Sequence, residues 1–182
     1  MDEALAAAQV AGSEADAGHA INIRAVIHWQ QGQLDEAEAG YHEARALALR
    51  AEERELAAMT AQNLGVIFSI RGDLRETLTH YEASLAEYRA LGKVQHVWGL
   101  LNNLGLVQTD LHRWEAAARS FAEALEIAEA LGDVTARSIL EVNIAKLRLA
   151  QGDHDGAEAA GQRALDLALL ADDELNRARA SW

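Results

Sequence analysis

The stretch LNNLGLVQTDLHRWEAAARSFAEALEIAEALGD, residues 101–133, decides the fold of this chain. Asn103 and Gly105 are residue types typical of turns, yet they lie within a long apolar run. Apolar side chains recur around them at helical spacing, at Leu101, Leu104, Val107 and Leu111. A second helix is indicated by Phe121, Leu125 and Ala128. The stretch therefore predicts two antiparallel helices, with Gly105 inside the first of them where two helices approach closely.

The same pattern occurs four times with a period of 40 residues. Small residues fill one column, at Ala25, Gly65, Gly105 and Ala145. Two further columns hold small side chains, at Ala37, Thr77, Ala117 and Ala157, and at Ala44, Ser84, Ala124 and Ala164. An aromatic column holds Tyr41, Tyr81 and Phe121, with Gly161 in the fourth copy. Several columns that recur at one period indicate an internal repeat.

The ends of the expected helices carry recognisable signals. Glycines that can adopt the left-handed backbone follow the first helices, at Gly32, Gly72 and Gly152. His112 takes this column in the third copy. Asp73 and Asp133 are the expected N-caps of the helices that follow them.

Composition supports an all-α chain and excludes several classes of function. Half of the residues are hydrophobic and a quarter are charged, and there is no proline and no cysteine. The absence of cysteine fits a cytoplasmic protein and excludes disulfides and thiolate metal sites. No window approaches the roughly 18 uninterrupted apolar residues of a membrane-spanning helix. The net charge of −13 argues against nucleic acid and anionic membranes as partners.

These columns resemble the tetratricopeptide repeat family, most closely over residues 101–133. The period of 40 residues is longer than the usual 34. In this it is similar to the long-helix repeats of kinesin light chains, bacterial peptide-sensing regulators and the sensor arms of signalling ATPases. The resemblance implies a right-handed α-α superhelix, or solenoid, of antiparallel helix pairs.

The repeat divides the whole chain, which we expect to be a single array over residues 1–182. The complete units would be residues 13–52, 53–92, 93–132 and 133–172. Residues 1–12 would be the second helix of a truncated preceding unit, and residues 173–182 the start of a truncated next unit. Truncated ends expose apolar faces, so self-association through them is also expected.

No catalytic or metal-binding pattern is evident. No two of the seven histidines lie four or fewer residues apart, so the helical two-histidine zinc pattern is absent. No serine lies in a G-x-S-x-G elbow, and no glycine-rich phosphate loop occurs. The sequence therefore predicts neither an enzyme nor a cofactor.

The resemblance implies a concave groove lined by the first helix of each unit. Side-chain amides recur there in two adjacent columns, at Asn22, Gln62 and Asn102, and at Asn63, Asn103 and Asn143. The expected groove also includes Trp29, Val66, Leu106 and Lys146. An amide both donates and accepts hydrogen bonds, so it can bind a peptide backbone whatever its sequence. In kinesin light chains, similar groove asparagines contact peptide ligands.

Two interpretations of these amides stay open, because asparagines could instead link adjacent helices to one another. Our leading hypothesis is a non-catalytic module that binds a peptide segment of a protein partner in the groove. Such a module would belong to a larger bacterial-type regulatory or signalling protein. The alternative is an architectural or oligomerising segment with no peptide ligand, and a third reading places this segment beside an enzyme domain as its effector.

Overall fold

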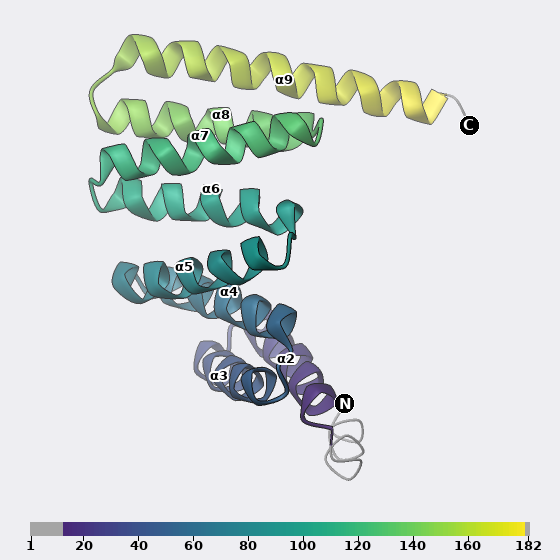
Figure 1. The fold of residues 1–182 in the computed structure, drawn as a ribbon. Helices are drawn as coiled ribbons and strands as arrows, with labels where there is room; N and C mark the ends of the chain where they lie inside the picture. The colour runs from purple at the N-terminus through teal and green to yellow at the C-terminus, as the bar shows by residue number, and fades with distance from the viewer. Residues whose placement is uncertain (1–12, 181–182) are drawn as a thin grey trace. The chain divides into compact units, whose positions relative to one another are not determined.

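The computed structural model describes residues 13–180, with side chains placed for residues 13–172. Eight helices and no strand occur in this part of the chain (Figure 1). They are α2 (Glu14–Gln30), α3 (Leu34–Arg50), α4 (Arg54–Ile70), α5 (Leu74–Ala90), α6 (Val94–Asp110), α7 (Trp114–Ala130), α8 (Val134–Ala150) and α9 (His154–Ala180). The prediction of an all-α helical repeat is confirmed. The helix proposed for residues 1–12 lies outside the described residues.

The helices form two compact units, residues 1–93 and residues 94–182. In the first unit α2 packs on α3 and α4 packs on α5, while α4 also contacts α2 and α3. In the second unit α6 packs on α7 and α8 packs on α9, while α8 also contacts α6 and α7. Figure 1 shows the helices of each pair running antiparallel, as the short turns between them require.

A left-handed residue recurs every 20 residues at the turns between helices. Glycine supplies it five times, at Gly32, Gly72, Gly92, Gly132 and Gly152, with φ between 67° and 79°. Glu52 and His112 adopt the same conformation with φ of 57° and 56°. The expected caps are confirmed, because the carboxylates of Asp73 and Asp133 accept hydrogen bonds from the backbone N–H groups of Glu76 and Ala136.

An aromatic side chain packs directly against a glycine within two of the helix pairs. A Cβ atom at Gly105 would lie 2.5 Å from the ring of Phe121, and one at Gly65 would lie 2.5 Å from the ring of Tyr81. Both distances are too short for carbon atoms in contact. The prediction that Gly105 marks a close helix approach is confirmed. In the first pair Tyr41 packs with Ala25, so an alanine is accommodated there.

The end of the described chain differs from expectation. Residues 173–180 continue α9 without a turn, although we predicted that a new helix would begin at Asp173. Asp172 occupies the column of Gly92 and Gly132, where a left-handed backbone is unfavourable for a residue with a side chain. Glu52 turns the chain in that column because α4 packs back on α3.

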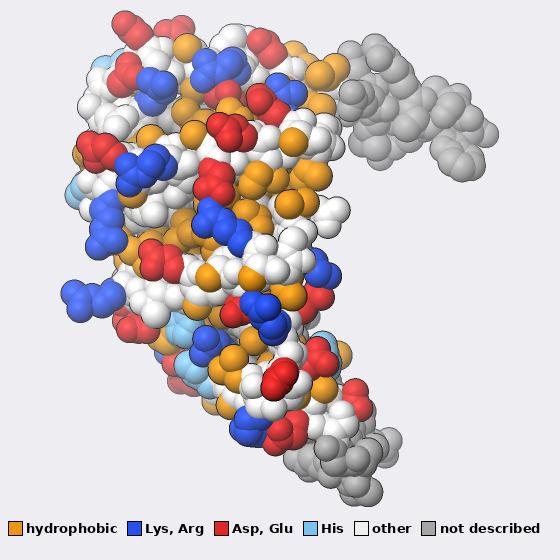
Figure 2. Space-filling model, viewed as in Figure 1, with side chains coloured by type: hydrophobic (Ala, Val, Ile, Leu, Met, Phe, Trp, Pro, Cys, Tyr) orange, Lys and Arg blue, Asp and Glu red, His pale blue; other side chains and the backbone are white. Residues whose placement is uncertain are grey.

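Ion pairs join helices both within and between the helix pairs of the first unit. Arg71 binds the carboxylates of Asp35 and Glu38, so the end of α4 is tied to the start of α3. Arg50 and Glu14 form a further pair, with 2.8 Å between Nε and Oε1. Figure 2 shows acidic and basic side chains interspersed on the visible face of each unit. Such exposed pairs contribute about 0–1 kcal/mol each.

Candidate functional site

The residues expected to line a groove lie on the first helices and differ in exposure. Gln62, Asn63, Val66, Asn103 and Leu106 are half-buried, while Trp29 and Lys146 are exposed. The remaining three amides, of Asn22, Asn102 and Asn143, are buried. The ten residues are therefore divided between the helix surface and the contacts between neighbouring first helices.

The buried amides link first helices within each unit. In the second unit Nδ2 of Asn143 donates to Oδ1 of Asn102 over 2.8 Å, and Nζ of Lys146 donates to Oδ1 of Asn143 over 3.3 Å. In the first unit Nδ2 of Asn63 donates to Oδ1 of Asn22 over a longer 3.4 Å. The helix-linking role that the sequence left open is thus present in both units. It is strong in the second unit and weak in the first.

Three of the expected residues meet at a cavity between α2 and α4, with a volume of about 290 Å³. The α2–α4 cavity is lined by Val26, Trp29, Tyr41, Met59, Asn63 and Val66. Tyr41 and Met59 were not predicted. Met59 lies one helical turn before Asn63, so helical spacing alone could have placed it on this face. Tyr41 could not be found in this way, because it enters from α3 and its repeat column indicates only a core aromatic.

The α2–α4 cavity contains polar groups whose hydrogen-bonding capacity is unused. Tyr41 is 2% exposed, and no described residue forms a hydrogen bond with its hydroxyl. Burial raises its pKa to about 12, so the phenol is neutral. Asn22, which does not line the cavity, is buried and donates from Nδ2 to Sδ of the lining residue Met59 over 3.5 Å. A thioether is a weak acceptor.

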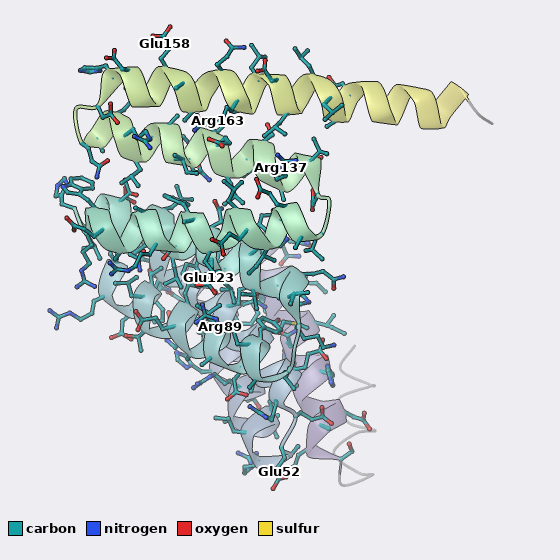
Figure 3. All side chains as sticks on the ribbon, turned by 45° about the horizontal axis from the view of Figure 1, so that its top comes forward. Glu52, Arg89, Glu123, Arg137, Glu158 and Arg163 are labelled. Atoms are coloured by element: carbon teal, nitrogen blue, oxygen red, sulfur yellow. The ribbon has the colours of Figure 1, made fainter. Side chains whose placement is uncertain are left out.

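A second cavity, of about 310 Å³, lies among α7, α8 and α9. Its walls include Phe121, Leu147 and Arg148. At its edge Arg163 reaches from α9 toward α8 (Figure 3), where Nε and Nη2 each donate to the Glu141 carboxylate over 2.8 Å. The cationic groups of this cavity are already paired, since Arg148 binds Asp153 over 2.6 Å.

The first unit fills the equivalent place with rings. Phe68 stacks on His80 with 5.2 Å between ring centroids, and His80 meets the edge of His42 at 6.0 Å. The residues 80 positions later are Arg148, Ala160 and Ala122. Loss of these rings accounts for the space beside α8 in the second unit.

The described residues contain no group of three or more side chains suited to a metal ion. Among these residues, no helix is both long enough and apolar enough to cross a membrane.

Comparison with known proteins places the chain in a family. The family model described as Tetratricopeptide repeat matches residues 16–90 and 97–170. The chain belongs to the tetratricopeptide repeat family. Members of this family are typically non-catalytic interaction scaffolds. No curated protein matches the chain.

Solved structures share the fold of this tetratricopeptide repeat chain at low sequence identity. BtubC from P. vanneervenii has a TM-score of 0.81 at 22% identity, covering 87% of this chain and 66% of BtubC. A Rap protein complexed with Competence and Sporulation Factor has a TM-score of 0.70 at 16% identity, covering 85% and 43%. A putative kinesin light chain of P. anserina with nearly identical TPR-like repeats has a TM-score of 0.71 at 12% identity, covering 86% and 77%. The chain therefore spans about two thirds of BtubC and less than half of the Rap protein.

Proposed function

We propose that this tetratricopeptide repeat chain is a non-catalytic module that binds an extended, uncharged peptide segment of a protein partner. The segment lies on the first helices, and the module serves within a larger cytoplasmic regulatory or signalling protein. One observation carries the proposal. The proposed binding face is made of four repeat columns, those of Asn22, Asn63, Val66 and Trp29, and each column holds one residue from every repeat. Lys146 is the only charged residue in these columns, although a quarter of the residues in the whole chain are charged.

The chemistry of these columns suits a peptide backbone. Positions i, i+1, i+4 and i+7 of a helix lie on one side of it. Gln62, Asn63 and Asn103 present partly exposed amides there, and Val66 and Leu106 present apolar neighbours. An amide pairs with backbone N–H and C=O groups without a charge. A charged ligand would lose hydration on this surface and find few counter-charges. The Rap protein that shares the fold was solved with Competence and Sporulation Factor bound, which supports a ligand-binding role.

A phage-displayed library of seven-residue peptides tests this function. Selected peptides should be poor in Asp, Glu, Lys and Arg and should bind the purified chain in calorimetry. Asn63→Ala should weaken binding about fivefold, the equivalent of one hydrogen bond of about 1 kcal/mol. Gln162→Ala removes an exposed amide of α9 and serves as the matched control. Selection of no binding peptide, or affinities insensitive to both Asn63→Ala and Asn103→Ala, would refute the proposal.

The architectural alternative also has an observation in its favour. Leu165, Leu169 and Leu170 of α9 are all more than 40% exposed, and such a cluster favours contact with another protein surface. Under this alternative the chain would self-associate, and Leu165→Gln with Leu169→Gln would return it to a monomer. Sedimentation velocity at two protein concentrations distinguishes the two. A monomer at both concentrations excludes self-association.

A further inference from the structure

The α2–α4 cavity is apolar over most of its wall. Val26 and Val66 contribute branched side chains, Trp29 contributes an indole that is 40% exposed, and Met59 contributes a thioether. An indole and a thioether both make favourable contacts with an aromatic ring. This wall therefore suits a flat ring better than a slender aliphatic chain.

Polar atoms with unused hydrogen-bonding capacity accompany this wall. The Tyr41 hydroxyl can donate one hydrogen bond and accept others, and no described residue uses it. Oδ1 of Asn63 also accepts nothing from the described residues, since only its Nδ2 is engaged, over 3.4 Å. Both atoms are therefore available to form hydrogen bonds with a ligand. A ligand group that both donates and accepts would satisfy the hydroxyl and the amide together.

The volume of the cavity and the absence of charged residues in its wall restrict the kind of ligand further. A volume of about 290 Å³ lies at the lower limit of the roughly 300–1,000 Å³ typical of small-molecule sites, so one side chain fits better than a whole cofactor. No Asp, Glu, Lys, Arg or His lines the cavity. A carboxylate, phosphate or ammonium group would be desolvated there without a counter-ion.

Two other cavities lined by described residues lack this combination. Arg163 and Arg148 of the α7–α8–α9 cavity are paired with carboxylates. A cavity of about 270 Å³ between α3, α4 and α5 has the Arg54–Glu87 ion pair in its lining, with 2.8 Å between Nε and Oε2. In both, the arginines of the lining are already paired with carboxylates.

We propose that the α2–α4 cavity is a specificity pocket for the phenol side chain of a tyrosine in the bound segment. The ring lies against Trp29 and Met59, and its hydroxyl exchanges hydrogen bonds with Tyr41 and Asn63. Phenylalanine is disfavoured because it leaves both polar groups without a partner, and phosphotyrosine is excluded by its charge. This inference rests on the proposed function and adds to it the identity of one anchor residue.

N-acetyl-tyrosinamide is the probe, with N-acetyl-phenylalaninamide and N-acetyl-phosphotyrosinamide as comparisons. The chain has two methionines, Met1 and Met59. Methyl-¹³C-methionine labelling therefore gives a simple spectrum with one reporter inside the cavity. The tyrosine probe should shift the Met59 methyl signal with a Kd on the order of 1 mM, as expected for a ligand of this size. The phenylalanine probe should bind about fivefold more weakly, and the phosphotyrosine probe should cause no shift.

Two variants introduce residues that other repeats carry in the same column, so both are expected to fold. Tyr41→Phe introduces the residue present at Phe121 and should abolish the preference for tyrosine over phenylalanine. Val66→Lys introduces the residue present at Lys146 and should block both probes. Ile139→Lys introduces the same charge at an exposed apolar position of α8 and should leave the titration of Met59 unchanged. Circular dichroism verifies that each variant is folded.

Each outcome either supports or overturns the pocket. Equal affinity for the tyrosine and phenylalanine probes, retention of the preference in Tyr41→Phe, binding of the phosphotyrosine probe, or no shift at 20 mM overturns it. If peptides selected from the library bind in an Asn63-dependent way while the probes fail, the proposed function stands and only the pocket is wrong. If the library yields nothing while the tyrosine probe behaves as expected, the cavity binds a phenol, but the proposed function is wrong and so is the assignment of the cavity as an anchor for a bound segment.

Discussion

Gly105→Ala and Gly99→Ala form a matched pair on α6 that tests the packing at the centre of the repeat. Both glycines lie inside the same helix. A Cβ atom at Gly105 would lie 2.5 Å, 2.7 Å and 2.8 Å from three ring carbons of Phe121, whereas a Cβ atom at Gly99 would meet nothing within 4 Å. The pair separates the intrinsic helix preference from the steric requirement.

The expected magnitudes follow from these distances. Replacing glycine by alanine inside a helix stabilises it by about 1 kcal/mol, and this gain applies at both positions. Overpacking at Gly105 costs about 1–3 kcal/mol, because the rigid Phe121 ring is held between helices and must move. Gly99→Ala should therefore raise the free energy of unfolding by about 1 kcal/mol. Gly105→Ala should lower it by about 0–2 kcal/mol, so the two variants differ by about 1–3 kcal/mol.

Urea unfolding followed by far-ultraviolet circular dichroism measures the difference, and thermal melts should separate the variants by about 2–4 °C per kcal/mol. Phe121→Leu provides a second check. If the ring is the obstacle, the double variant Gly105→Ala/Phe121→Leu is more stable than the sum of the two single effects. Equal stability of Gly105→Ala and Gly99→Ala, or strict additivity in the double variant, would show that close helix approach is not the reason for Gly105.

Three further predictions follow from the polar contacts. Arg163→Ala should lower the free energy of unfolding by about 1–3 kcal/mol, because Glu141 is 6% exposed and its carboxylate loses both donors. The double variant Glu141→Leu/Arg163→Met places leucine at position 141, as at Leu101 in the preceding repeat. In urea unfolding its stability should stay within about 1 kcal/mol of the parent. Asn143→Ala should cost about 1–3 kcal/mol and Asn63→Ala less than about 1 kcal/mol, because the first breaks a buried 2.8 Å bond and the second a 3.4 Å bond; equal losses in melting experiments would contradict this. Burial, Arg45 and His42 lower the pKa of His80, so the folded state binds this proton less tightly than the unfolded chain does. Stability is therefore lost as the pH falls from 6.5 through the lowered pKa. The urea midpoint of His80→Phe should fall less over this pH window than that of the parent.

Much of the fold could be predicted from the sequence because the repeat gives four observations of each position. Gly65 and Gly105 could each be taken for a turn, but in a column with Ala25 and Ala145 they indicate a small residue inside a helix. The positions of the turns are predicted in the same way by Gly32, Gly72 and Gly152. His112 shows the limit of residue type alone, since it adopts the left-handed backbone that is uncommon for residues other than glycine.

The candidate site was predicted less completely, for physical reasons. Periodicity places Trp29, Asn63 and Val66 on one side of the first helices, but it cannot show which amide bonds which neighbour. The Asn22–Asn63 and Asn102–Asn143 bonds join residues 41 apart, one column out of register, so they depend on how helices are offset. The entry of Tyr41 into the α2–α4 cavity depends on packing between three helices, which no single column encodes.

The repeat columns distinguish the positions that pack the helices together from the positions that a partner would contact. Columns at the helix contacts keep small residues in every copy, as at Ala44, Ser84, Ala124 and Ala164, all of which are buried. The face columns do not keep one type: Val26, Val66, Leu106 and Lys146 form one of them, and Trp29, Ser69, Thr109 and Leu149 another.

Packing constrains volume and tolerates few changes, whereas a surface position is free to vary unless something outside the chain depends on it. If the face were idle, substitutions there should include acidic residues, which are the most abundant charged type in the chain. None occurs in these two columns. Exclusion of acids from an otherwise variable face is what a binding surface for an uncharged segment requires. Val66→Asp should therefore harm binding while leaving the helix pair folded.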